Sequence, residues 1–250
     1  MNLLSVRDLH VHLGQAHVLH GLSFDVPEGA VTALLGRNGV GKTTTLRSLV
    51  GLVGREGAVD YAGESIAALP THRVIRRGIG YVPEDREIFA GLTVEENLRL
   101  AERAAASAFW RRAGKAGTSP GSVKPTPLRY DLVYDLFPEL RARGRQRAGT
   151  LSGGQQQMLT LGRALVNDNR LLLVAEPTKG LSPLLVTEVA KALERIREHT
   201  TVLLVEQNLG VVRHIAEHVV VLDQGRVVHT GPAQELLDDR DLVHSLLGVA

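Results

Sequence analysis

Apolar and polar residues alternate near the start of the chain, whereas the apolar runs further on are continuous. Residues 3–12 (LLSVRDLHVH) and 17–26 (HVLHGLSFDV) alternate, which is typical of strands with one exposed face. After a turn at 27–29, the apolar run at 31–36 (VTALLG) predicts a buried strand, and a helix is expected at about 42–50. The opening third is therefore predicted to combine antiparallel-looking strands with a strand–loop–helix unit.

The second half alternates strand and helix patterns. Apolar runs predict strands within 171–177 (LLLVAEP), 201–207 (TVLLVEQ), 218–223 (HVVVLD) and 226–231 (RVVHTG), and a helix is expected from Pro183 to about Glu198. Such alternation favours a parallel sheet with helices on its faces. The predicted fold class is therefore α/β with a parallel-sheet core.

A region with a different pattern separates these two parts. Thr93 and Glu96 form a capping box that predicts a helix through NLRLAERAAA. Residues 103–130 hold six basic residues and no acidic one, and their Gly, Ser and Pro content predicts a flexible loop at 114–127. Phe109–Arg112 (FWRR) fits contact with a membrane surface or an acidic partner, or a helix end packed on its own subdomain with solvated arginines.

Composition limits the class of protein without identifying it. The 250 residues are 44% hydrophobic and 22% charged, as in an ordinary globular domain, and a net charge of +2 is weak support for nucleic-acid binding. The absence of cysteine excludes disulfides and thiolate sites and suits a reducing compartment. A signal peptide is not expected, because its apolar stretch would be interrupted by Arg7, Asp8 and His10. No apolar run is long enough to span a bilayer.

The sequence GRNGVGKT at 36–43 matches the phosphate-loop pattern completely and lies between a predicted strand and a predicted helix. In this motif the glycines turn backbone N–H groups towards the phosphates and the helix N-terminus adds partial positive charge. Lys42 would reach the outer phosphates, and the Thr43 hydroxyl would bind Mg²⁺. The motif predicts binding of a nucleoside triphosphate.

A second helix start with exposed backbone N–H groups follows at LSGGQ (151–155), where Ser152 and Gln155 form another capping-box pattern. The phosphate loop already accounts for one nucleotide in this chain. We therefore expect the second helix start to bind the nucleotide of a neighbouring chain.

Three motifs, GRNGVGKTT (36–44), LSGGQ (151–155) and EPTKGLSP (176–183), occur in an order and spacing that resemble the ATP-binding subunit of an ABC transporter. The resemblance covers nearly the whole chain. Two further segments, YVPEDREIFAGLTVEENL (81–98) and LLVEQN (203–208), are most similar to the ATPase subunits of branched-chain amino acid, amide and urea importers.

The resemblance implies a P-loop NTPase fold in one nucleotide-binding domain, residues 1–250. Its core, at about 1–85 and 160–250, would include an N-terminal antiparallel β subdomain, and a helical subdomain would be inserted at about 86–159. The ligands implied are ATP and Mg²⁺, bound in a head-to-tail dimer of ATPase subunits. The other partners implied are transmembrane permease subunits and, indirectly, a solute-binding protein, with no nucleic acid. The subunit would lie at the cytoplasmic face of the membrane, held there by the permease.

The same resemblance implies roles for individual residues. Phosphates and Mg²⁺ would be bound by Gly36, Asn38, Gly39, Gly41, Lys42, Thr43, Thr44 and Glu84, with Thr43 and Glu84 nearest the metal. The opposite chain's ATP would be contacted by Ser152, Gly153, Gly154 and Gln155. Glu176 would be the general base that orients the attacking water and takes its proton. Lys42 and Gln207 would be the other catalytic residues.

Four positions depart from the broad family pattern. Glu84 stands where most members have glutamine and Gln207 where most have histidine, but both residues resemble the amino-acid importer branch. The amide of Gln207 can still donate a hydrogen bond to a phosphate. Leu13 replaces the aromatic residue that usually stacks on adenine, so base binding should be looser. His12 or His17 would be the candidate for a partial substitute, but surface histidines are commoner than ligands, which favours an ordinary surface role for both.

Ala175 is the most serious departure, since it replaces the aspartate that holds Mg²⁺ through its water shell. Outer-shell partners contribute about 10- to 100-fold in affinity or activity, so we expect nucleotide binding to persist and hydrolysis to be slow. Natural loss of the aspartate and an engineered substitution would both place alanine here, and the sequence does not distinguish them. Three functions remain open: a hydrolysing importer subunit, a non-hydrolysing partner in a heterodimer, and an ABC ATPase acting on nucleic acid or ribosomes. The single phosphate loop and single LSGGQ disfavour the third.

Overall fold

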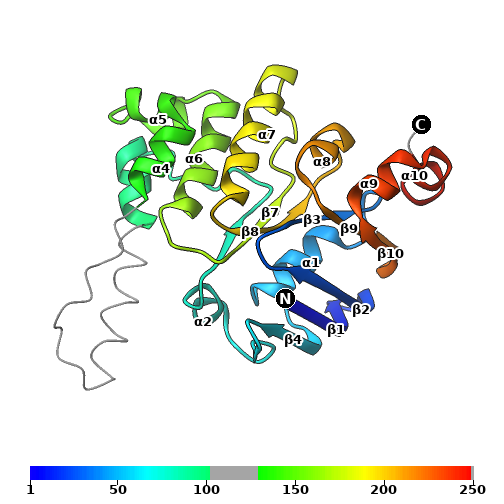
Figure 1. Cartoon of the computed structure of the whole chain (residues 1–250). Coiled ribbons are helices and arrows are strands. Elements are labelled where there is room, and N and C mark those ends of the chain that lie inside the picture. Colours follow the sequence, from blue (N-terminus) through cyan, green and yellow to red (C-terminus); the bar gives the residue numbers. More distant parts are fainter. Residues whose placement is uncertain (102–128, 249–250) are drawn as a thin grey trace. The chain divides into compact units, whose positions relative to one another are not determined.

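A computed structural model describes residues 1–101 and 129–248, which form two compact units (Figure 1). The first unit comprises Met1–Glu84 and Arg170–Ala250, and the second comprises Asp85–Asn169. Among the described residues no helix has the length and apolar character that crossing a bilayer requires. The predicted loop at 114–127 and the segment Phe109–Arg112 lie outside the described residues.

A six-stranded sheet forms the centre of the first unit, in the order β10-β9-β3-β8-β7-β6. Neighbouring strands are parallel except for β9 and β10, which are antiparallel. This confirms the predicted α/β class with a parallel core. The strands are β3 (Val31–Leu35), β6 (Ile79–Val82), β7 (Leu171–Ala175), β8 (Thr201–Val205), β9 (His218–Asp223) and β10 (Arg226–Pro232).

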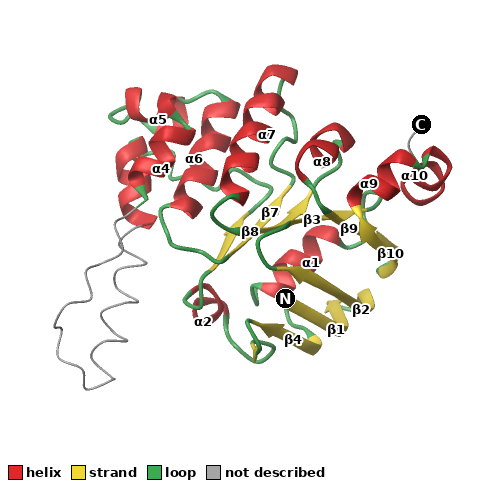
Figure 2. Ribbon diagram, in the orientation of Figure 1, coloured by secondary structure: helices red, strands yellow, loops and turns green. Residues whose placement is uncertain are grey.

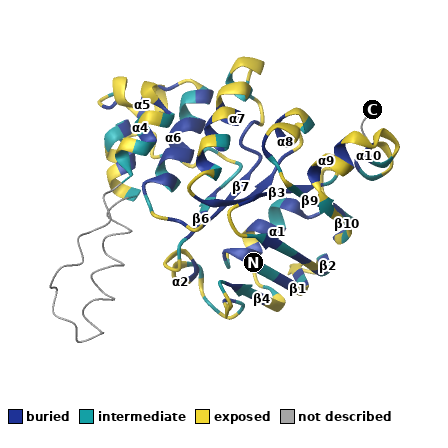
Figure 3. Cartoon of the chain, in the orientation of Figure 1, coloured by how far each residue is buried: buried dark blue, intermediate teal, exposed yellow. Residues whose placement is uncertain are grey.

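The inner strands are apolar because both faces of this sheet are covered. Every residue of β3, β7 and β8 is buried, as Figure 3 shows for β3 and β7. Leu34 and Leu203 join a core with helix α1 on one face, and Ala33 and Leu35 join a second core with α8, α9 and α10 on the other. The helices of this unit are α1 (Lys42–Leu49), α2 (Thr71–Ile75), α7 (Pro183–Arg197), α8 (Leu209–Ile215), α9 (Ala233–Asp238) and α10 (Arg240–Leu247).

The alternating segments at the start of the chain form a separate four-stranded antiparallel sheet, in the order β2-β1-β4-β5 (Figure 2). Its apolar side chains, including Leu9, Leu22 and Val59, belong to the core that also contains Leu34 and Leu46 of α1. The two sheets of the first unit therefore share one core. The strands are β1 (Asn2–Leu13), β2 (Ala16–Pro27), β4 (Glu56–Tyr61) and β5 (Glu64–Ser65).

The described part of the second unit is helical. Its predicted first helix begins at the capping box, in which Glu96 N donates to Thr93 Oγ1 (3.2 Å) and Thr93 N donates to Glu96 Oε2 (2.8 Å). The unit continues to Asn169, ten residues beyond the expected boundary near 159, because one unbroken helix reaches Leu165 and contacts the two helices before it. The elements after 128 are α4 (Tyr130–Leu136), α5 (Pro138–Ala142), the 3₁₀ turn η1 (Ala148–Thr150) and α6 (Gly153–Leu165).

Candidate functional site

The glycine-rich loop between β3 and α1 has a backbone that only glycine allows. Gly36, Gly39 and Gly41 all have positive φ angles, of 140°, 82° and 104°. A Cβ atom on Gly36 would lie 2.3 Å from the carbonyl oxygen of Leu222, and one on Gly41 would lie 2.5 Å from Leu19 Cδ2. No side chain caps α1, so the N–H groups of its first turn face outwards and can bind an anion.

Lys42 begins α1 and folds back over this loop. Its side chain is buried, with 4% exposure, and Nζ donates to the carbonyl oxygens of Gly36 (2.7 Å) and Arg37 (2.8 Å). Burial lowers the pKa of Lys42, the carboxylates of Glu176 and Glu84 oppose that shift, and the charge of Lys179 adds to it. The ammonium group thus lies among the charged side chains of one site.

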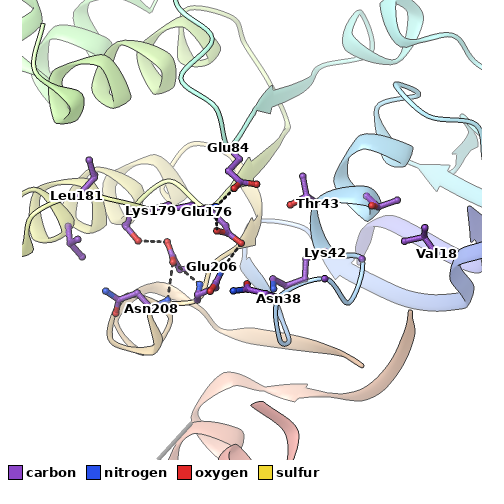
Figure 4. A pocket seen from close by; sticks show the side chains of 16 residues that line it. Val18, Asn38, Lys42, Thr43, Glu84, Glu176, Lys179, Leu181, Glu206 and Asn208 are labelled. Carbon is purple, nitrogen blue, oxygen red and sulfur yellow. Dashed lines mark hydrogen bonds and ion pairs between the residues drawn. The ribbon is translucent and has the colours of Figure 1, made fainter. Parts of the chain in front are cut away.

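A cavity of about 580 Å³ opens beside the loop (Figure 4). It lies beyond the carboxyl ends of β3, β6, β7 and β8, which is where ligands bind in open parallel sheets. Nine predicted residues line it: Asn38, Gly39, Gly41, Lys42, Thr43, Thr44, Glu84, Glu176 and Gln207. Gly36 is not among the lining residues; it lies against the backbone carbonyl of Leu222.

Glu176 and Gln207, which sequence analysis assigned separately, are in direct contact. Gln207 Nε2 donates to Glu176 Oε1 at 2.6 Å, although the residues are 31 positions apart. Glu176 is buried, with 7% exposure, and its φ of 43° lies in the left-handed region. Its backbone N–H donates to the carbonyl oxygen of Val205 (2.8 Å), so the ends of β7 and β8 together hold this carboxylate.

The buried carboxylate of Glu206 was not predicted from the sequence. Its Oε2 accepts from Thr178 Oγ1 (2.7 Å), and its Oε1 accepts from the backbone N–H groups of Gln207 (2.7 Å) and Asn208 (3.0 Å). The side chain therefore ties the segment after β7 to the segment after β8. A signal was present, since Glu206 directly follows the apolar run of β8 as Glu176 follows that of β7.

Lys179 is a second cavity residue that sequence analysis missed. Its Nζ forms an ion pair with Glu84 and lies 3.8 Å from Glu176 Oε2. Glu84 follows β6 and Glu176 follows β7, so this ammonium group bridges carboxylates from two neighbouring strand ends.

Ala175, the last residue of β7, is completely buried and belongs to the apolar core that includes Leu34, Leu46 and Leu203. Its side chain is a methyl group, so it has no oxygen atom to offer to a metal or to the metal's water shell. In the described ranges, no group of three or more His, Asp or Glu side chains is arranged to hold a metal ion. The oxygen atoms of Thr43 and Glu84 still line the cavity, and this donor set fits Mg²⁺, which commonly takes one or two protein ligands beside phosphates and water.

The LSGGQ residues lie at the start of α6 in the second unit. The predicted capping box is confirmed: Gln155 N donates to Ser152 Oγ (3.3 Å), and Ser152 N donates to Gln155 Oε1 (3.1 Å). The remaining polar atom of Gln155, Nε2, donates to Glu139 Oε2 at 2.7 Å. Gly153 and Gly154 form the first turn of α6. Gly154 is buried, and a Cβ atom on Gly153 would lie 2.7 Å from the guanidinium of Arg86, which covers this end of the helix.

The hairpin of β1 and β2 carries the candidate substitutes for an adenine-stacking residue. Leu13 is exposed at the end of β1, and the ring centroids of His12 and His17 are 4.1 Å apart and stacked. His17 also lies 4.0 Å from the ring of His20, and its Nε2 is 3.1 Å from Nδ1 of His10. Among the hairpin residues, Val18 is the one that lines the cavity.

Comparison with known proteins identifies similar chains over the full length. The sequence pattern of the family described as "ABC transporter" matches residues 19–179. The chain is 37% identical to the high-affinity branched-chain amino acid transport ATP-binding protein BraG of Pseudomonas aeruginosa, over 98% of this chain and 100% of the relative. It is 35% identical to the probable branched-chain amino acid transport ATP-binding protein LivF of Archaeoglobus fulgidus, over 99% of both chains.

A crystal structure of a nucleotide-free ATP-binding cassette from an ABC transporter has the same fold, with a TM-score of 0.80, 23% identity and full coverage of both chains.

Proposed function

This chain belongs to the ABC transporter family of ATPases, and on that premise we propose that it is the ATP-binding and ATP-hydrolysing subunit of an importer for small polar solutes. Branched-chain amino acids or related amides are the solute class, because the relatives that it matches along its whole length bear the names of branched-chain amino acid transport proteins. The family relationship supports ATP as the nucleotide.

The observation that carries the proposal is the hydrogen-bonded pair of Glu176 and Gln207 in the same cavity as Lys42. Lys42 would bind the outer phosphates when it exchanges its loop carbonyl partners for phosphate oxygens. The carboxylate of Glu176 would orient a water molecule and take its proton as the bond to the terminal phosphate breaks. Gln207 holds that carboxylate through Oε1, which leaves Oε2 on the side of Lys179.

Magnesium would be held by Thr43, Glu84 and the phosphates, and when bound it neutralises charge that develops on the phosphate oxygens. Ala175 removes the carboxylate that would orient the water shell of the metal. The loss corresponds to about 10- to 100-fold in metal affinity or activity, which is roughly 1.4–2.7 kcal/mol. We infer a site that binds ATP and hydrolyses it slowly.

The proposed assembly rests on the second motif, LSGGQ. Ser152, Gly154 and Gln155 are proposed to contact the terminal phosphate bound to a second ATPase subunit, in a head-to-tail dimer that drives permease subunits. The subunit would then lie at the cytoplasmic face of the membrane, held there by the permease and coupled through it to a solute-binding protein. Mg²⁺ as the metal, and one nucleotide-binding domain with a helical subdomain inserted at about 86–159, are parts of the same proposal.

A second function competes with the first on specific residues. In a heterodimer, a non-hydrolysing chain could contribute its LSGGQ to a competent neighbour. The methyl group of Ala175 and the exposed Leu13 favour that function, whereas the buried, hydrogen-bonded Glu176 opposes it.

Measuring Mg²⁺-dependent ATP turnover for the unaltered chain and for Ala175→Asp separates these functions. Restoring the carboxylate should raise turnover by about 10- to 100-fold. Ala175→Asn is the matched control because it adds nearly the same volume without charge, and Glu176→Gln in each background removes the base. No turnover in either the unaltered chain or Ala175→Asp, with ATP still bound, would establish the non-hydrolysing subunit.

A further inference from the structure

Lys179 occupies a position in the cavity that the proposed mechanism does not use. It lies in the turn between β7 and α7, and its side chain, 60% exposed, extends towards the end of β6 (Figure 4). There it forms its ion pair with Glu84, and its Nζ remains 3.8 Å from Glu176 Oε2. One flexible cation therefore contacts both the residue proposed for Mg²⁺ and the residue proposed as base.

The contacts of Lys179 matter for phosphate binding because the cavity contains several carboxylates. Glu84, Glu176 and Glu206 line the same cavity as Lys42 and Lys179. Glu206 is satisfied by the Thr178 hydroxyl and two backbone N–H groups, whereas Glu84 and Glu176 lie next to the proposed position of the phosphates. Without a cation between them, these two carboxylates would repel a triphosphate.

Ala175 weakens the divalent-cation site at the same place, since its methyl group cannot orient the water shell of a metal. A lysine differs from Mg²⁺ in being permanently attached to the chain. Its ammonium is a compact point charge with three donors on a four-carbon stem, so it can pair with carboxylates and with phosphate oxygens by small rotations.

We propose that Lys179 is a tethered cation of the nucleotide site, which neutralises Glu84 and Glu176 and lets this chain bind ATP with little dependence on divalent metal. The proposal rests on the proposed binding of ATP and assigns Lys179 as a nucleotide-positioning residue. It predicts that metal and lysine are partly interchangeable: when either is present, the two carboxylates no longer oppose the phosphates.

The test is calorimetric titration of the full chain with ATP, once with MgCl₂ and once with EDTA. For the unaltered chain the two dissociation constants should differ by no more than a few-fold. In Lys179→Met the affinity for ATP in EDTA should fall by about tenfold. The reason is that the carboxylates of Glu84 and Glu176 would then repel the phosphates without a cation between them, in a site that is partly exposed to solvent. The affinity in MgCl₂ should change much less.

Three further variants sharpen the test. Lys179→Arg keeps the charge and should behave like the unaltered chain. Lys191→Met is the matched control, because Lys191 is an exposed lysine of α7 that does not line the cavity. Glu84→Gln removes one of the two carboxylates that Lys179 neutralises. In that background, Lys179→Met should therefore lower the affinity for ATP in EDTA by less than it does in the unaltered chain.

An equal loss of affinity with and without metal in Lys179→Met would overturn the proposal and leave Lys179 as a structural ion pair. Complete dependence of the unaltered chain on Mg²⁺ would overturn it as well. Failure of the proposed function is a different result: the unaltered chain would then bind no ATP even in MgCl₂.

Discussion

Replacing Glu206 by alanine should destabilise the protein more than any surface change near the cavity. The side chain is 3% exposed and accepts three hydrogen bonds, from Thr178 Oγ1, Gln207 N and Asn208 N. A hydrogen bond to a charged group contributes roughly 1.5–3 kcal/mol, so three of them set an upper limit of about 5–9 kcal/mol. Water from the adjoining cavity can satisfy part of what is lost, so we expect about 3 kcal/mol.

For a chain of this size, about 3 kcal/mol lowers Tm by roughly 6–12 °C, which thermal unfolding followed by circular dichroism measures directly. Glu206→Gln is the control: its Oε1 can still accept from both backbone N–H groups, and its amide can donate to the Thr178 hydroxyl. We expect that variant to lose under about 1 kcal/mol. Equal losses in the two variants, or a shift of under 2 °C or so in Glu206→Ala, would refute the assignment of these bonds as the link between the strand ends.

Two other predictions use side chains whose pKa is lowered by their surroundings. Lys42→Ala should weaken ATP binding by about 100-fold, because a charged hydrogen bond to phosphate is lost, and a titration that shows affinity equal to that of Lys191→Ala would contradict this. Desolvation, together with the charges of His20, His12 and His10, lowers the pKa of His17 below 6.5, the usual value for a histidine. The unfolded chain therefore binds more protons at His17 just below pH 6.5, so stability is lost as the pH falls through that value and is unaffected well above it. The fall in Tm between about pH 8 and pH 5.5 should be smaller in His17→Gln than in the unaltered chain, and identical falls would exclude the effect.

Features that depend on neighbouring residues were predictable from the sequence. The phosphate loop lies between β3 and α1 as its pattern required, and both capping boxes form with the expected hydrogen bonds. In each of these cases the interacting groups are at most a few positions apart. Local spacing is therefore sufficient to predict them without knowledge of tertiary contacts.

Features that depend on strand order were not predictable in the same way. The pair of Lys179 and Glu84 joins residues 95 positions apart, and that of Thr178 and Glu206 joins residues 28 apart. The first pair requires β6 to lie beside β7, and the second requires β8 to lie beside β7. The order of elements along the chain does not specify this arrangement. The end of the helical subdomain was expected near 159, whereas the second compact unit extends to Asn169, since α6 packs on α4 and α5.

Glu176 connects the backbone geometry with the choice between the two functions. A non-glycine residue in the left-handed region typically costs about 1–3 kcal/mol, and here the conformation is held by the Val205 carbonyl and the Gln207 amide. Glycine at this position would avoid that cost, and a chain that only bound nucleotide would need no carboxylate there. A strained and buried glutamate directly after Ala175 is therefore better explained by a site that still takes a proton from water than by one that only completes a neighbour's site.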